Sequence, residues 1–251
     1  MNQYSYSRVE CFRKCPYQFY LKYVKQYKTL KSQEANDARY LGSALHLGIE
    51  KRNVAAGIKE YKKQYYQLND LHLHEQMKLE VMMKKTIALL NTLEGKFIHE
   101  YEINLPEYKG FVDLMIIKEN GKVDIIDFKY SNNEASYMQS AQLHIYKHYL
   151  EKLGWQVDQL GYLFIPKVQI RQKKTESLYQ FRKRLKEELT HKEPYIKRVE
   201  YDKSKIDEFI SDIELIEKSQ VFEKKTTKFC NWCEYKNYCL TGDMSEMILP
   251  S

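Results

Sequence analysis

The spacing of apolar residues changes near position 96, and this change divides the chain into a helical part and a strand-rich part. Before it, apolar side chains recur at helical intervals over 5–24, 40–56 and 60–93, with a break in the last near Asn69-Asp70. After it they first alternate as they do in strands. The elements predicted there are strands 97–105, 111–118, 122–129, 159–166 and 195–201, and helices 134–153, 176–192 and 204–219.

The order of these elements predicts the fold class. The Asn120-Gly121 pair between the second and third strands is typical of a hairpin turn. A helix between the third and fourth strands predicts a β-α-β crossover. We therefore expect an α/β fold, in which a mixed sheet has helices on both sides. A chain of 251 residues suits a single domain, with a helical part over 1–95, a core over 96–170 and a second helical part over 171–251.

Composition and charge narrow the class of partner. With 43% hydrophobic and 30% charged residues, the chain is expected to be globular and soluble. It has no apolar run that would cross a bilayer and no signal peptide at its start, so we expect it in the cytoplasm. The formal charge is +7, basic residues gather over 167–184, and 22 tyrosines offer stacking surfaces. These features favour a polyanion such as DNA over a membrane.

Two neighbouring predicted strands each carry a carboxylate, Asp113 and Asp127. Lys129 lies two positions beyond Asp127 and so shares its face, while Phe128 points to the core. Converging carboxylates repel each other in a partly buried site unless a cation lies between them. Mg²⁺ suits such oxygen ligands and keeps waters that can meet a phosphate. The chemistry implied is metal-assisted hydrolysis of a phosphodiester.

The cysteines lie at the two ends of the chain. They are Cys11, Cys15, Cys230, Cys233 and Cys239. An odd number in a chain expected in the cytoplasm argues against a disulfide framework, and the C-x2-C-x5-C spacing favours a metal centre. One N-terminal cysteine and the last three would form a four-thiolate site that joins the chain ends; we favour Cys15, which precedes Pro16, over Cys11. Both a [4Fe–4S] cluster and zinc accept four thiolates.

Taken in chain order, the motifs resemble those of a known family. They are His46 on a helix, Gly110-x-x-Asp113, Asp127-x-Lys129 and Gln142-x-x-x-Tyr146. This order resembles the RecB-type branch of the PD-(D/E)XK nuclease superfamily. The cysteine plan is similar to that of its iron–sulfur members, the CRISPR-associated exonuclease family and the AddB nuclease domain. The resemblance covers about 6–239 and implies a restriction-endonuclease-like mixed sheet flanked by helices, with the terminal segments joined by a metal cluster.

The resemblance also implies roles for single residues. His46, Asp113, Asp127 and the backbone carbonyl of Phe128 would bind Mg²⁺ or Mn²⁺. Lys129 would orient the attacking water, and Gln142 and Tyr146 match positions that touch the DNA strand or the active-site shell. A [4Fe–4S] cluster is favoured over zinc, on Cys15, Cys230, Cys233 and Cys239. Glu100 and Glu102, on the strand before Asp113, are at most an additional acid near the metal and are not assigned as ligands.

The function expected from these features is that of a metal-dependent DNA exonuclease. It would act on single-stranded DNA or DNA ends in recombination, repair or CRISPR adaptation, together with proteins of such pathways. Two other classes stay open, a non-catalytic DNA-binding module of such a complex and a DNA endonuclease. The intact Asp-x-Lys motif counts against the first, and the lack of a separate recognition domain counts against the second.

Overall fold

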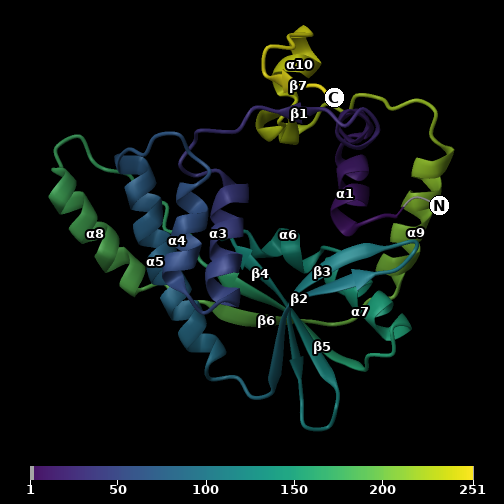
Figure 1. Ribbon diagram of the computed structural model, residues 1–251, viewed down its shortest axis with the longest axis horizontal. Coiled ribbons are helices and arrows are strands. Elements are labelled where there is room, and N and C mark those ends of the chain that lie inside the picture. Colours follow the sequence, from purple (N-terminus) through teal and green to yellow (C-terminus); the bar gives the residue numbers. More distant parts are fainter. Residues whose placement is uncertain (1–2, 251) are drawn as a thin grey trace.

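A mixed five-stranded β-sheet forms the centre of the computed structural model, which describes residues 3–250 (Figure 1). Its strands, in order across the sheet, are β2 (Lys96–Asn104), β3 (Lys109–Ile117), β4 (Val123–Tyr130), β5 (Val157–Ile165) and β6 (Tyr195–Val199). Neighbouring strands are antiparallel except β4 and β5, which are parallel. This arrangement confirms the predicted hairpins and the crossover that follows them.

Helices cover both faces of the sheet, as the sequence predicts. One group consists of α3 (Ala38–Glu50), α4 (Val54–Lys62), α5 (Asp70–Leu90) and α8 (Leu178–Thr190), and the other of α1 (Tyr6–Lys14), α7 (Gln142–Lys152) and α9 (Ser204–Lys218). The first group packs on sheet residues that include Ile126 and Phe128. The second packs on residues that include Val112 and Ile125. Strand β4 therefore lies between α3 and α7, which contact it from opposite faces.

A glycine allows α3 to pack closely against its neighbours. A Cβ at Gly48 would lie 2.2 Å from the Met83 sulfur of α5 and 3.3 Å from the Gly57 Cα of α4. A side chain at this position would therefore push the helices apart. Because His46 is only two residues away, this packing also sets the position of the imidazole above the sheet.

Several predicted helices are divided, each at a recognisable backbone feature. The predicted helix 5–24 is interrupted at Cys15, which is extended because it precedes Pro16, and continues as α2 (Pro16–Phe19) and η1 (Tyr20–Val24). The predicted helix 40–56 ends at Glu50, and Asn53 caps the next helix by accepting a hydrogen bond from the Ala56 backbone N–H at 3.1 Å. No helix in residues 3–250 has both the length and the apolar character to cross a membrane.

A segment from the first 30 residues of the chain lies beside a segment from the last 25 at one end of the molecule (Figure 1). Strand β1 (Lys28–Thr29) pairs antiparallel with β7 (Met247–Ile248). The segment before β7 contains η2 (Lys228–Trp232) and α10 (Lys236–Thr241), the region of the three C-terminal cysteines. An ion pair of 2.8 Å between Lys22 and Glu234 adds a second link between the ends. The N- and C-terminal regions of the chain are thus in contact, whereas a metal cluster between them stays a prediction.

Candidate active site

Asp113 and Asp127 occupy opposite positions where β3 and β4 separate. The ladder pairs Leu114 with Ile126 and does not continue to these two aspartates. Instead, the Phe128 backbone N–H donates a hydrogen bond of 2.6 Å to Asp113 Oδ2. The Asp113 side chain therefore replaces a ladder hydrogen bond and ties β3 to β4 at the edge of the site.

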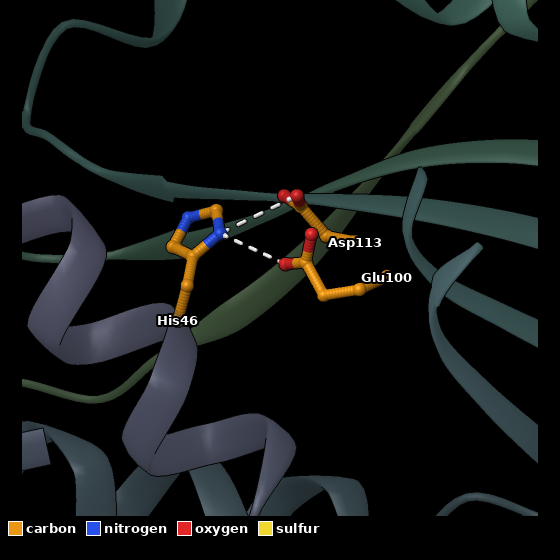
Figure 2. Close-up of side chains that lie close together, drawn as sticks. All are labelled: His46, Glu100 and Asp113. Carbon is orange, nitrogen blue, oxygen red and sulfur yellow. Dashed lines mark ion pairs between the residues drawn. The ribbon is translucent and has the colours of Figure 1, made fainter. Parts of the chain in front are cut away.

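Three side chains from three separate elements converge beside this edge, as Figure 2 shows. His46 of α3 points its Nδ1 at Asp113 Oδ1, 3.3 Å away, and at Glu100 Oε1 of β2, 3.7 Å away. Ligand atoms of all three residues lie within 4.8 Å of one another. In the described part of the chain, this is the group of His, Cys, Asp and Glu side chains that is compact enough to hold a metal ion.

Glu100 reaches this group through an unusual backbone conformation. Its φ is +50°, although it lies inside β2, and the ladder between β2 and β3 pairs the residues on either side of it but not Glu100 itself. A residue other than glycine in this region costs about 1–3 kcal/mol, and such strain gathers at functional sites. Period-two alternation predicts one face for Glu100 and Glu102 and gives no reason to choose between them. In the structure Glu102 instead pairs with Lys109 at 2.7 Å.

The carboxylates around His46 determine its charge. Burial alone would lower the pKa of the imidazole, but the negative charge of Asp113 and hydrogen bonds to Asp113 and Glu100 outweigh it and raise the pKa to about 10. His46 is therefore protonated at neutral pH in the metal-free protein. A metal ligand must be a neutral imidazole, so binding of a divalent cation here would release this proton.

Asp127 is almost completely buried, at 1% exposure, and the ammonium group of Lys129 on the same strand balances its charge. Burial raises the pKa of its carboxyl group to about 6; Asp113 adds to this shift, whereas Lys129 and His46 oppose it. Lys129 Nζ lies 2.5 Å from Asp127 Oδ2. The lysine thus faces the carboxylate, as the shared strand face predicts.

Gln142 and Tyr146 hold Lys129 from the next helix. Lys129 Nζ donates a hydrogen bond of 3.0 Å to Gln142 Oε1, and Gln142 Nε2 donates one of 2.9 Å to the Tyr146 hydroxyl. The ammonium group also lies 5.1 Å from the centre of the Tyr137 ring. The two residues of the Gln-x-x-x-Tyr motif therefore orient the lysine, because they lie one turn apart on α7.

The donors present fit a hard divalent cation. Carboxylate oxygens and a histidine nitrogen converge on one point, and Asp127 Oδ2 is buried without a hydrogen bond among the described residues, although it faces Lys129. The predicted ligands His46 and Asp113 are brought together, and Glu100 joins them. Asp127 lies beside this group against Lys129, so its role as a ligand, like that of the Phe128 carbonyl, stays a prediction.

The four predicted cluster cysteines line one cavity of about 240 Å³ near the chain ends. They are Cys15, Cys230, Cys233 and Cys239. Cys11 does not line it but packs against the apolar core, and burial raises the pKa of its thiol to about 11. Within residues 3–250, no three cysteine sulfurs lie within 4.8 Å of one another. Four thiolates on one zinc ion would be about 3.8 Å apart, given Zn–S bonds of about 2.3 Å.

Replacing Glu100 by glutamine tests whether it is part of the metal site. We expect Glu100→Gln to weaken Mn²⁺ binding at least tenfold, because one anionic oxygen donor is lost from the group around His46. Glu102→Gln is the matched control, since Glu102 is on the same strand as Glu100 but its carboxylate pairs with Lys109 of β3. Mn²⁺ titration followed by electron paramagnetic resonance measures both. Equal affinities for the two variants would remove Glu100 from the site.

The raised pKa of Asp127 predicts how stability depends on pH without metal. In the folded protein the Asp127 carboxyl group stays protonated up to about pH 6, whereas in the unfolded chain it loses its proton near the ordinary aspartate pKa of 3.8. Between these two pH values, a rise in pH therefore lowers the free energy of unfolding. Asp127→Asn should therefore increase the free energy of unfolding at pH 8 by up to about 3 kcal/mol, and by little at pH 4.

Urea denaturation in EDTA measures this difference. Asp158→Asn is the control of opposite sign, because a hydrogen bond from Lys118 lowers the pKa of Asp158. An Asp127→Asn protein that is less stable than the wild type at pH 8 would contradict the account of the site.

Comparisons with known proteins relate nearly the whole chain to one family. A solved structure titled "Crystal structure of SSO0001" is 15% identical, with a TM-score of 0.40 over 95% of this chain and 86% of that one. The search of curated proteins finds no match. The family model described as "PD-(D/E)XK nuclease superfamily" matches residues 3–240, nearly the whole chain. Proteins of this superfamily use divalent metals, and the mixed sheet flanked by helices is consistent with their restriction-endonuclease-like fold. The chain therefore belongs to the PD-(D/E)XK nuclease superfamily.

Proposed function

We propose that this protein is a metal-dependent DNA exonuclease that acts on single-stranded DNA or on DNA ends. The observation that carries the proposal is the meeting of carboxylates, His46 and Lys129 where β3 and β4 separate. Membership of a nuclease superfamily supports phosphodiester hydrolysis. The RecB-type order of motifs and the iron–sulfur pattern of cysteines support the finer assignment, with a place in recombination, repair or CRISPR adaptation.

In the proposed mechanism, His46, Asp113 and Asp127 would hold Mg²⁺ or Mn²⁺, with Glu100 beside them. The ion supplies Lewis-acid polarisation of the phosphodiester and lowers the pKa of a bound water. Lys129 donates a hydrogen bond to the attacking water and offsets the charge that develops on the phosphoryl oxygens. In-line attack breaks the bond from phosphorus to the 3′ oxygen, which leaves a 5′ phosphate and a 3′ hydroxyl.

The positioning of Lys129 is the contribution of α7. An ammonium group on a flexible side chain helps a reaction only when it is held in place. Gln142 accepts a hydrogen bond from Lys129, and Tyr146 accepts one from Gln142. These two side chains thereby direct the ammonium group toward Asp127 and the water that it would orient.

We further propose a [4Fe–4S] cluster on Cys15, Cys230, Cys233 and Cys239. These residues line one cavity, so one cysteine near the start of the chain faces the same space as the three near its end. A four-iron cluster spans a wider space than one ion and takes four thiolates. Burial raises the pKa of the Cys233 thiol, and nearby Cys15 and Cys239 add to this shift, so a metal centre would compensate the charge of the thiolates.

Cleavage of linear and circular single-stranded DNA tests the enzymatic proposal. With Mn²⁺, the wild type should degrade the linear form and leave the circle intact, because an exonuclease requires an end. Lys129→Ala should lower kcat by about 10²–10³, the effect of losing one donor to developing charge. Lys122→Ala is the control, since this exposed lysine of the β3–β4 hairpin lies away from the site.

Each result separates one class of function from the others. Cleavage of circles would identify an endonuclease, and no cleavage of either form would leave a DNA-binding module. Cleavage by Lys129→Ala at the wild-type rate would refute the assigned site. Circular dichroism of the variants checks that they remain folded.

Iron content and visible absorption of anaerobically purified protein test the cluster. We expect a brown protein with about four iron atoms per chain. Cys15→Ala should lose most of this iron, whereas Cys11→Ala should keep it, because Cys11 lies outside the cavity. A colourless protein that contains zinc would contradict the cluster and leave the nuclease site untouched.

A further inference from the structure

A second cavity, of about 700 Å³, lies between the starts of α3 and α8, the first half of α5, and the segment that follows β5. None of the predicted site residues lines it. Its volume is within the range of about 300–1,000 Å³ that is usual for small-molecule sites. Its wall includes the start of the basic segment 167–184, and the proposed mechanism gives this segment no role.

The end of β4 and the residues that follow it connect this cavity to the catalytic centre. Tyr130, which lines the cavity, directly follows Lys129 on β4. Two residues further, Asn132 Nδ2 donates a hydrogen bond of 2.9 Å to the Lys167 carbonyl, and the Lys167 N–H donates one of 2.8 Å to Asn132 Oδ1. This pair of bonds holds the wall of the cavity to the end of the strand that bears Asp127 and Lys129.

Lys167 is a half-buried cation without a carboxylate partner in residues 3–250. Its Nζ lies 4.9 Å from the centre of the Tyr130 ring. Burial lowers the pKa of its ammonium group; the charge of Glu75 opposes this shift, and that of Lys78 adds to it. A desolvated cation without a counter-ion favours an anionic ligand, which would restore its lost interactions.

The other charged residues of the cavity do not cancel its preference for an anionic ligand. Glu75 and Lys78 neutralise each other in an ion pair of 2.6 Å. Of the remaining charged residues on the wall, Arg171 is a second cation and Glu34 is the one carboxylate. Leu41 of α3, Leu71 of α5 and Phe181 of α8 add apolar surface to the lining, beside polar side chains that include Asn36 and Gln169. The cavity therefore offers cations for a phosphate and apolar surface for a base.

We propose that this cavity binds one nucleotide of the DNA strand next to the scissile phosphodiester, with its phosphate against Lys167 and Arg171. The inference rests on the proposed function and assigns the binding of the flanking nucleotide to the basic segment after β5. The strand would run from the metal site along the end of β4 into the cavity. Phosphate contacts of this kind position the strand without reading its sequence.

Binding of a labelled single-stranded oligonucleotide in EDTA, followed by fluorescence anisotropy over a salt series, tests the proposal without cleavage. Lys167→Ala should raise Kd about tenfold, the usual effect of one charge-assisted hydrogen bond. It should also reduce the slope of log K against log salt by about 0.7, because one phosphate contact is lost. Lys167→Arg should restore most of the affinity and the slope.

Lys174→Ala is the matched control, since Lys174 is an exposed lysine of the same segment that does not line the cavity. Its Kd and salt slope should equal those of the wild type. Equal losses in Lys167→Ala and Lys174→Ala, or no loss in either, would overturn the assignment of the cavity. Absence of DNA cleavage by the wild type would count against the proposed function alone, because the binding measurement does not depend on it.

Discussion

The carboxylates of Asp113 and Asp127 lie at an opened edge of β3 and β4 with little access to water. Burying negative charge there is costly unless cations lie close by. In the metal-free protein, the protonated ring of His46 beside Asp113 and the ammonium group of Lys129 beside Asp127 offset this cost. A divalent cation would take over the role of the first and leave the second free to act on water.

Helices on both faces of the sheet contribute to this charge balance. From one face, α3 carries His46, and its close packing at Gly48 keeps the ring over Asp113. From the other face, α7 carries the hydrogen-bonded pair that holds Lys129. The site therefore depends on the spacing of two helices across β4, and a shift of either would separate the cations from the carboxylates.

The C-terminal segment extends this dependence to the ends of the chain. Glu234, which follows Cys233, pairs with Lys22 and, at 3.4 Å, with Arg39 in the first turn of α3. The region of the proposed cluster thus contacts the helix that bears His46. Exposed ion pairs contribute little each, so a metal centre that joins Cys15 to the last three cysteines would add most of the stability of this contact.

The sequence predicted most of this arrangement because the deciding features are local. Alternation places Asp127 and Lys129 on one face, and the one-turn spacing of Gln142 and Tyr146 allows Tyr146 to bond the side chain that holds the lysine. It did not single out Glu100, whose approach to His46 depends on a left-handed backbone conformation inside a strand. It also missed the cavity beside Lys167, because segments far apart in the chain form it and no motif marks them.

The whole site depends on binding of a divalent cation by the group around Asp113. Anomalous X-ray diffraction from crystals soaked in Mn²⁺ would locate such an ion. We expect a peak bounded by His46, Glu100 and Asp113, at the edge where β3 and β4 separate and near Asp127. A folded protein in well-diffracting crystals with no peak there, or with its manganese bound elsewhere, would contradict binding at this site.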